Sequence, residues 1–167
     1  MSTGLDAVRV LVVDDNQHMR AIVGVMLNSF GIKMVREAKD GADAIDALRR
    51  WPADLAICDF LMDSMDGVEF TRQVRNATDS PNPYLPVVML TGHSELSRVT
   101  EARDAGVTEF VVKPLTAKAL VDRINTVIFK PRPFIRSRDY FGPDRRRKDD
   151  PFFAGPFRRE DDRKTRR

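Results

Sequence analysis

Five short apolar runs, separated by segments with helical spacing, constrain the fold of this chain more than any other feature of its sequence. The first run, residues 8–13, is rich in valine, as expected of a strand that is covered on both faces. In the segment that follows, apolar residues recur every three or four positions, which is typical of an amphipathic helix. Five strands alternating with five helices predict a parallel sheet with helices on both faces and right-handed crossovers. The predicted strands are residues 8–13, 32–38, 54–58, 86–90 and 107–112.

Short polar side chains mark the expected starts of the helices. Such side chains accept hydrogen bonds from the free N–H groups of a first turn, and glycine commonly ends a helix. A weakly apolar helix is expected over residues 94–105, ended by Gly106, and the last helix closes the domain near Phe129. The expected caps are Asn16, Asp40, Asp66 and Thr116.

Charged or hydroxylic residues directly follow four of the runs. They are Asp14 and Asp15, Asp59, Thr91 and Lys113. The carboxyl ends of parallel strands meet at one edge of a sheet, where open α/β sheets bind ligands, so we expect these side chains to converge. Mg²⁺ prefers carboxylate oxygens, and an ammonium and a hydroxyl can bind phosphoryl oxygens. The pattern therefore predicts a divalent-metal and phosphoryl site that acts by positioning and electrostatics.

Each of these residues has a simpler interpretation when it is taken alone. Asp14 and Asp15 could merely start a helix, since aspartate caps helices well, and Asp59 could belong to an ordinary strand-end turn. The group as a whole favours a metal site, because a buried Lys113 with no acidic partner would be costly. The single cysteine, Cys58, is interpreted as a packed strand residue rather than a redox centre, and it excludes an internal disulfide.

Five motifs occur in order over residues 7–129. They are Val12-Val13-Asp14-Asp15-Asn16, Asp59-Phe60-Leu61-Met62-Asp63-Ser64-Met65-Asp66-Gly67, Val88-Met89-Leu90-Thr91-Gly92, Ala105-Gly106-Val107 and Phe110-Val111-Val112-Lys113-Pro114. Each is weak alone, but five in order at matching intervals are specific. Together they resemble the receiver domains of two-component response regulators in bacteria. The resemblance implies a flavodoxin-like (βα)5 three-layer sandwich, with a parallel five-stranded sheet of order 2-1-3-4-5.

The resemblance implies a role for each residue of the predicted site. Asp59 would accept a phosphoryl group from a histidine kinase or phosphotransfer protein. Asp14, Asp15 and Asp59 would hold Mg²⁺, together with the backbone carbonyl of Leu61. Lys113 would neutralise one phosphoryl oxygen. The chain would be a phosphoprotein that catalyses only its own phosphorylation and dephosphorylation, so we expect it not to be an enzyme acting on other substrates.

The resemblance also implies a conformational switch. Thr91 would follow the phosphoryl group, and Phe110 would turn inward as Thr91 moves. The Lys113–Pro114 bond would be cis, which costs little before proline, and would turn the lysine into the site. The surface of the fourth helix, fifth strand and fifth helix would change its affinity for a downstream protein target. A homodimer through that surface is a further option.

The sequence departs from the family pattern at Asp63, where proline is usual, and this places an extra carboxylate near the expected metal. Leu61 and His93 stand at positions that tune dephosphorylation in the family. Leu61 cannot orient a water molecule, whereas His93 has the chemistry to do so or is a plain loop residue. We expect slow hydrolysis of the phosphorylated form.

The charge distribution divides the chain near residue 130. Residues 130–167 hold 14 Lys and Arg against 7 Asp and Glu, whereas residues 1–129 hold 14 against 18. We expect residues 1–129 to form the receiver domain and residues 130–167 a basic, largely irregular tail without a core of its own. No apolar run approaches the length of a membrane span, no secretory signal is expected, and we expect a cytoplasmic protein.

The tail contains a short internal repeat. Residues 140–146, with an aromatic pair, Gly-Pro and Arg-Arg, resemble residues 152–159. The tail could be a solvated segment, or its aromatics and arginines could dock on a partner or contribute to assembly. The interspersed acids and the lack of a recognition helix argue against nucleic-acid binding. Deletion of residues 131–167 is expected to leave phosphorylation intact and to alter partner binding.

The sequence therefore predicts a response regulator with one receiver domain, and two rival functions stay open. A constitutive scaffold would keep the fold without using phosphate, and the intact set of site residues argues against it. A metal-dependent phosphatase of the haloacid dehalogenase type needs a second acid two positions after its aspartyl nucleophile, and Leu61 stands at that position. Turnover of a small phosphate ester would favour the phosphatase.

Overall fold

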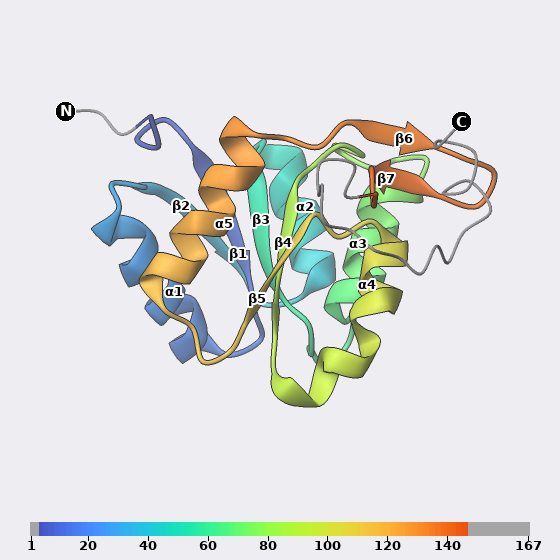
Figure 1. Ribbon diagram of the computed structural model, residues 1–167. Coiled ribbons are helices and arrows are strands. Elements are labelled where there is room, and N and C mark those ends of the chain that lie inside the picture. Colours follow the sequence, from blue (N-terminus) through green and yellow to red (C-terminus); the bar gives the residue numbers. More distant parts are fainter. Residues whose placement is uncertain (1–3, 147–167) are drawn as a thin grey trace.

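The protein was analysed as a computed structural model that describes residues 4–146 (Figure 1). A parallel sheet of order β2-β1-β3-β4-β5 lies between two layers of helices, and a small antiparallel hairpin, β6-β7, follows the last helix. This confirms the flavodoxin-like fold and its strand order. The strands of the large sheet are β1 Arg9–Val13, β2 Met34–Ala38, β3 Leu55–Asp59, β4 Val87–Thr91 and β5 Glu109–Val112. The helices are α1 Gln17–Ser29, α2 Gly41–Arg50, α3 Gly67–Asn76, α4 Val99–Ala105 and α5 Ala117–Phe129, and the hairpin strands are β6 Phe134–Arg136 and β7 Phe141–Pro143.

Local capping explains where the helices begin. The Asn16 side chain accepts from the N–H groups of His18 and Met19, and Thr116 accepts from Ala119 N–H. Asp40 and Asp66 cap α2 and α3 in the same way. All four expected caps are confirmed, because each depends only on residues within one turn.

The core consists of two apolar layers, one on each face of the sheet. Side chains alternate along a strand, so Val10 and Val12 face α1 and α5, whereas Leu11 and Val13 face α2 and α3. The central strands β3 and β4 are buried along their whole length. Cys58 is buried in the second layer, as expected of a packing residue, and burial raises the pKa of its thiol.

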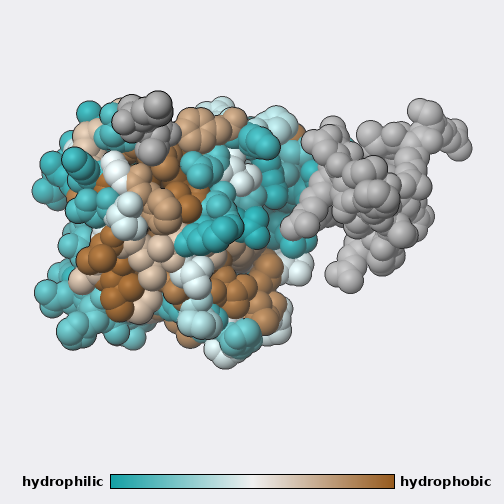
Figure 2. Space-filling view, turned by 60° about the vertical axis from the view of Figure 1, so that its left-hand side comes forward, coloured by the Kyte–Doolittle hydropathy of each residue, from teal (hydrophilic) through white to brown (hydrophobic). Residues whose placement is uncertain are grey.

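Apolar side chains also reach the surface. Figure 2 shows brown patches among hydrophilic residues on the face that carries α1. Ile22 and Val25 of α1 are exposed, as are Leu96, Val112 and Phe129. Within residues 4–146, no helix combines the length and apolar character that crossing a bilayer requires.

The region expected to be one helix over residues 94–105 is instead two elements. A 3₁₀ helix, η1 His93–Arg98, precedes the short α4. No side chain caps either element, and Glu95 is buried while Leu96 is exposed. Inward packing of a polar residue disrupts the apolar face that a continuous α-helix would need. Gly106 ends α4 in the left-handed conformation, with φ of 107°.

The tail differs from the expectation of irregular structure within residues 130–146. The hairpin β6-β7 forms there and packs against α3 (Figure 1). Tyr140 and Phe141 are buried, and the Phe141 ring packs against Tyr84 of the receiver fold. The ordered part of the chain thus extends past Phe129, where α5 ends as expected. The second copy of the repeat, residues 152–159, lies outside the described residues.

Candidate functional site

The strand order brings the predicted site residues to one edge of the sheet. β1 pairs with β3, so the residues that follow Val13 lie beside those that follow Cys58. Thr91 ends β4 and Lys113 directly follows β5. The backbones of these two residues meet, since Lys113 N donates to Thr91 O at 2.7 Å. All the strands end at the same edge, as the sequence predicted.

Three carboxylates gather at this edge. Asp14, Asp15 and Asp59 each place a carboxylate oxygen within 4.8 Å of the other two. Asp14 and Asp59 are buried and Asp15 is exposed. Lys113 Nζ donates to Asp59 Oδ1 at 2.8 Å. The site therefore holds three acids and one base, and it needs a further cation to balance its charge.

Asp14 shows the strongest sign of an absent ligand. Its Oδ1 accepts from Asn16 N–H at 2.9 Å, whereas its buried Oδ2 has no hydrogen-bond partner within residues 4–146. Burial raises the pKa of Asp14 to about 6, and the Asn16 hydrogen bond opposes that rise. A buried carboxylate oxygen is costly without a partner. A hard divalent cation such as Mg²⁺, which takes oxygen ligands, fits this donor set.

The carboxylate of Asp59 is buried and lies beside a cation. Burial raises the pKa of Asp59, and the hydrogen bond and charge of Lys113 oppose the rise. Lys113 thereby favours the ionised, nucleophilic form of this carboxylate. The peptide bond between Lys113 and Pro114 is cis, as expected from the family resemblance.

The residues predicted to form the switch differ in burial, and their roles stay predictions. Thr91 is fully buried, and its hydroxyl has no hydrogen-bond partner among the described residues. Phe110 is half-buried against the apolar cluster of α3 and α4. Leu61 follows Asp59 by two positions and is half-exposed. A buried hydroxyl without a partner is unusual, and it leaves the Thr91 side chain able to donate a hydrogen bond to a ligand.

Two expectations about neighbouring residues receive different outcomes. Asp63 is exposed and does not belong to the group of three carboxylates. It therefore does not place an additional carboxylate within that group. His93 is exposed, and its expected role in dephosphorylation stays a prediction.

Sequence reasoning missed two arginines that position the site. Arg20 Nη1 donates to the main-chain oxygen of Asp14 at 2.7 Å, and its Nε pairs with Glu37 at 3.1 Å. Arg98 stacks over the Phe60 ring at 4.9 Å and lies 3.6 Å from Asp66. Arg98 and Phe60 are far apart in sequence, and the contact of Arg20 with Asp14 lies outside the helix periodicity, so the sequence pattern did not predict either contact.

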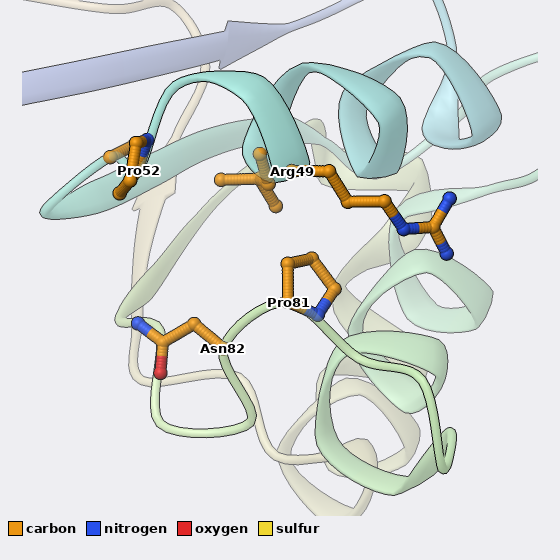
Figure 3. Close-up of a pocket in the computed structure, with 6 residues that line it drawn as sticks. Arg49, Pro52, Pro81 and Asn82 are labelled. Carbon is orange, nitrogen blue, oxygen red and sulfur yellow. The ribbon is translucent and has the colours of Figure 1, made fainter.

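A separate hollow of about 260 Å³ lies between the end of α2 and the loop before β4 (Figure 3). Pro52 and Ala53 precede β3, and Pro81 and Asn82 precede β4. The hollow thus lies at the amino edge of the sheet, opposite the three carboxylates. It does not take part in the candidate site.

Comparisons with known proteins agree with this geometry. Residues 10–125 match the family model of the response regulator receiver domain. The chain is 33% identical over 119 residues to the chemotaxis protein CheY-3 of Vibrio cholerae, covering 71% of this chain and 90% of that protein. It is 35% identical to the chemotaxis protein CheY of Pseudomonas aeruginosa, covering 71% of this chain and 94% of that protein. The crystal structure of CheY4 from Vibrio cholerae superposes with a TM-score of 0.66 at 30% identity, over 72% of this chain and 98% of that structure.

The parallel sheet of order 2-1-3-4-5, with acids at its carboxyl edge, defines the fold class of CheY-like receivers. The chain belongs to the response regulator receiver family. Membership is consistent with phosphoryl acceptance in two-component signalling. Residues 130–146 lie beyond the segment matched by the family model, so the hairpin is an addition to the receiver fold.

Proposed function

We propose that this chain is a single-receiver response regulator that accepts a phosphoryl group on Asp59 from a histidine kinase or phosphotransfer protein. The observation that carries the proposal is the 2.8 Å contact of Lys113 Nζ with Asp59 Oδ1, inside a group of three carboxylates within 4.8 Å. Chance placement of unrelated acids gives neither the lysine contact nor the unpartnered buried oxygen of Asp14.

The transfer is a displacement at phosphorus. An Asp59 carboxylate oxygen attacks the phosphorus of a phosphohistidine whose other ring nitrogen carries a proton, a P–O bond forms, and the P–N bond breaks with its electron pair going to nitrogen, which leaves a neutral imidazole on the donor. Lys113 holds a positive charge beside the reacting oxygens, and the Thr91 hydroxyl donates to one of them. Positioning and electrostatics carry such transfers. The chain would act on its own phosphoryl group and on no other substrate.

The metal requirement follows from like-charge repulsion. Asp14, Asp15 and Asp59 would hold Mg²⁺ together with the Leu61 carbonyl. The bound ion would neutralise charge on the phosphoryl oxygens. Arg20 keeps the Asp14 backbone in place through the 2.7 Å contact.

The output would be a population shift between two conformations. Thr91 and Phe110 would move together, and the exposed surface of α4, β5 and α5 would change its affinity for a downstream protein. Leu96 and Val112 expose apolar surface in this region, at 46% and 43%. Residues 130–167 would contribute to partner binding or assembly.

The proposal is tested by intact-mass measurement after incubation with Mg²⁺ and acetyl phosphate. A single added phosphoryl group is expected in the wild type and none in Asp59→Asn. A constitutive scaffold would gain no phosphoryl group in either protein. Release of inorganic phosphate from a small phosphate ester, in turnover amounts, would instead favour the phosphatase.

A further inference from the structure

The hairpin of residues 132–146 covers a defined surface at the amino edge of the sheet, the edge opposite Asp59 (Figure 1). We call it the docking surface, and its residues are Arg75, Tyr84, Asp104, Gly106 and Glu109. Arg145 pairs with Asp104, and Arg132 Nη2 lies 3.0 Å from Glu109 Oε1. The Tyr84 ring lies 5.2 Å from Phe134 and 5.4 Å from Phe141.

The docking surface is built around a buried cation. Arg75 donates to Gly106 O at 3.1 and 2.9 Å and to Pro83 O at 3.0 Å. Burial lowers the pKa of Arg75 to about 10, so it stays charged at neutral pH. The Phe134 ring covers this guanidinium at 5.0 Å, a favourable cation–π geometry. An aromatic ring of the hairpin therefore covers a cation that the receiver fold itself buries.

The backbones also fit closely. A Cβ added to Gly142 would lie 3.1 Å from the Gly106 Cα, and a Cβ added to Gly106 would lie 2.9 Å from Arg75 Cγ. Gly142 thus allows β7 to approach the turn between α4 and β5, whereas Gly106 leaves room for the buried Arg75 side chain. This close contact shows that the hairpin and the receiver fold are matched in shape.

Two elements connect the docking surface to the candidate phosphorylation site. β5 begins at Glu109, which contacts Arg132, and is followed by Lys113, which contacts Asp59. The η1–α4 segment carries Asp104 near one end. Arg98, which ends η1 in the middle of this segment, stacks over Phe60 and contacts Asp66, two residues that flank the acceptor loop. The hairpin thus contacts one end of β5 and one end of the η1–α4 segment, and both of these elements also contact residues at the acceptor loop.

We propose that residues 132–146 are a releasable occupant of the docking surface, and that docking is coupled to the phosphorylation state of Asp59. This inference rests on the proposed function. The hairpin contacts occur together with the direct 2.8 Å contact of Lys113 with Asp59, which leaves no space for a phosphoryl group between them. A phosphoryl group bonded to Asp59 Oδ1 would displace the Lys113 ammonium, and contacts that favour the present arrangement of β5 would oppose that displacement. A phosphoryl group on Asp59 consequently weakens docking, and weaker docking favours the phosphoryl-bound form by the same factor.

Amide hydrogen exchange of the full chain tests the first half of this relation. The reporters are Ser137 N–H, bonded to Tyr140 O, and Asp144 N–H, bonded to Pro133 O, each at 2.8 Å. We expect both amides to exchange faster with Mg²⁺ and acetyl phosphate than with Mg²⁺ alone, and we expect no difference in Asp59→Asn. Equal exchange in a chain that intact mass shows to be phosphorylated would overturn the coupling and leave the proposed function standing.

Binding of beryllofluoride, a phosphoryl analogue, tests the second half. Asp104→Asn and Arg145→Gln each remove one ion-pair partner on the surface. Both are expected to lower the dissociation constant for beryllofluoride in excess Mg²⁺, measured by fluorine NMR, by about fivefold or more. Asp46→Asn, which breaks an exposed ion pair with Arg49 on α2, should leave it unchanged. Wild-type affinity for beryllofluoride in both Asp104→Asn and Arg145→Gln would contradict the coupling. Failure of the wild type to bind the analogue or to gain a phosphoryl group would contradict the proposed function as well.

Discussion

Lys113 Nζ and Asp59 Oδ1 lie 2.8 Å apart although 54 residues separate them in the sequence. The contact forms because β3 and β5 both end at the same edge of the sheet, and it places a cation against the proposed nucleophile. We expect Lys113→Met to raise the pKa of Asp59 further and to slow phosphorylation by acetyl phosphate about 10²-fold. Lys118→Met is the matched control, because Lys118 is exposed and pairs only with Asp122 on α5. Similar rates for the wild type and Lys113→Met would exclude a role for the lysine.

The buried carboxylate of Asp14 predicts a pH dependence of stability. Its pKa is about 6 in the folded chain against an ordinary value of 3.8, so ionisation destabilises the metal-free folded state by about 3 kcal/mol at neutral pH. This cost is present above pH 6 and is relieved as the pH falls towards 4, because the folded state then binds the proton first. We expect Asp14→Asn to stabilise the metal-free protein at pH 7 more than at pH 4.5 in urea unfolding. An equal effect at both pH values would contradict the assignment.

The same substitution is expected to weaken Mg²⁺ binding. Asp14→Asn exchanges a charged ligand for a neutral one, and Arg20→Met removes the support of the Asp14 backbone. Outer contacts of this kind typically change metal affinity by about tenfold or more. Calorimetric titration with Mg²⁺ measures the metal affinity of both variants. Arg49→Met, which removes an arginine that pairs with exposed acids, should bind Mg²⁺ as the wild type does.

The lifetime of the phosphorylated form depends on whether a side chain orients the attacking water. Leu61 is half-exposed and apolar, so we expect slow hydrolysis, with a half-life of minutes or longer for the purified chain. Leu61→Gln supplies an amide at that position and should shorten the half-life, whereas Leu96→Gln on η1 should not. Decay within seconds in the wild type would show that another group, such as His93, orients the water.

The close approach of β7 to the receiver fold predicts a steric effect. In Gly142→Ala the new Cβ would meet the Tyr140 hydroxyl at 2.6 Å and Gly106 Cα at 3.1 Å, and we expect a loss of about 1–3 kcal/mol in the free energy of unfolding. Tyr140→Phe removes the hydroxyl that donates to Pro143 O and should cost about 1 kcal/mol. Gly24→Ala, with nothing within 4 Å of its Cβ, should stabilise α1 slightly. Urea unfolding measures the free energy of unfolding of the three variants and distinguishes these expected effects.

The helix starts were predictable because their causes are local. Asn16 and Thr116 bond to N–H groups two or three residues away, so the capping rule needs no tertiary information. Predicting that Asp14 and Asp59 converge required more information, because the alternation of strands and helices does not determine the order of the strands in the sheet. The family motifs supplied the order that places β1 beside β3.

The remaining features depend on side-chain contacts that lie outside the periodic patterns of the helices and strands. Arg20 and Arg98 act on Asp14 and Phe60 through side chains that no periodic pattern aligns. The hairpin was missed because its strands have only three residues each and its composition is rich in arginine. Its aromatic rings are buried only because Tyr84 and Arg75 provide the matching surface.

The central claim is that Asp59 is the phosphoryl acceptor, and localisation of the acyl phosphate tests it most directly. The full chain is incubated with Mg²⁺ and acetyl phosphate, reduced with borohydride, which converts an aspartyl phosphate to homoserine, and mapped by tandem mass spectrometry. We predict homoserine at position 59 alone, dependent on Mg²⁺ and lost in Lys113→Met at short times. Modification at Asp14 or Asp15 with Asp59 unchanged, or no modification at all, would contradict the account.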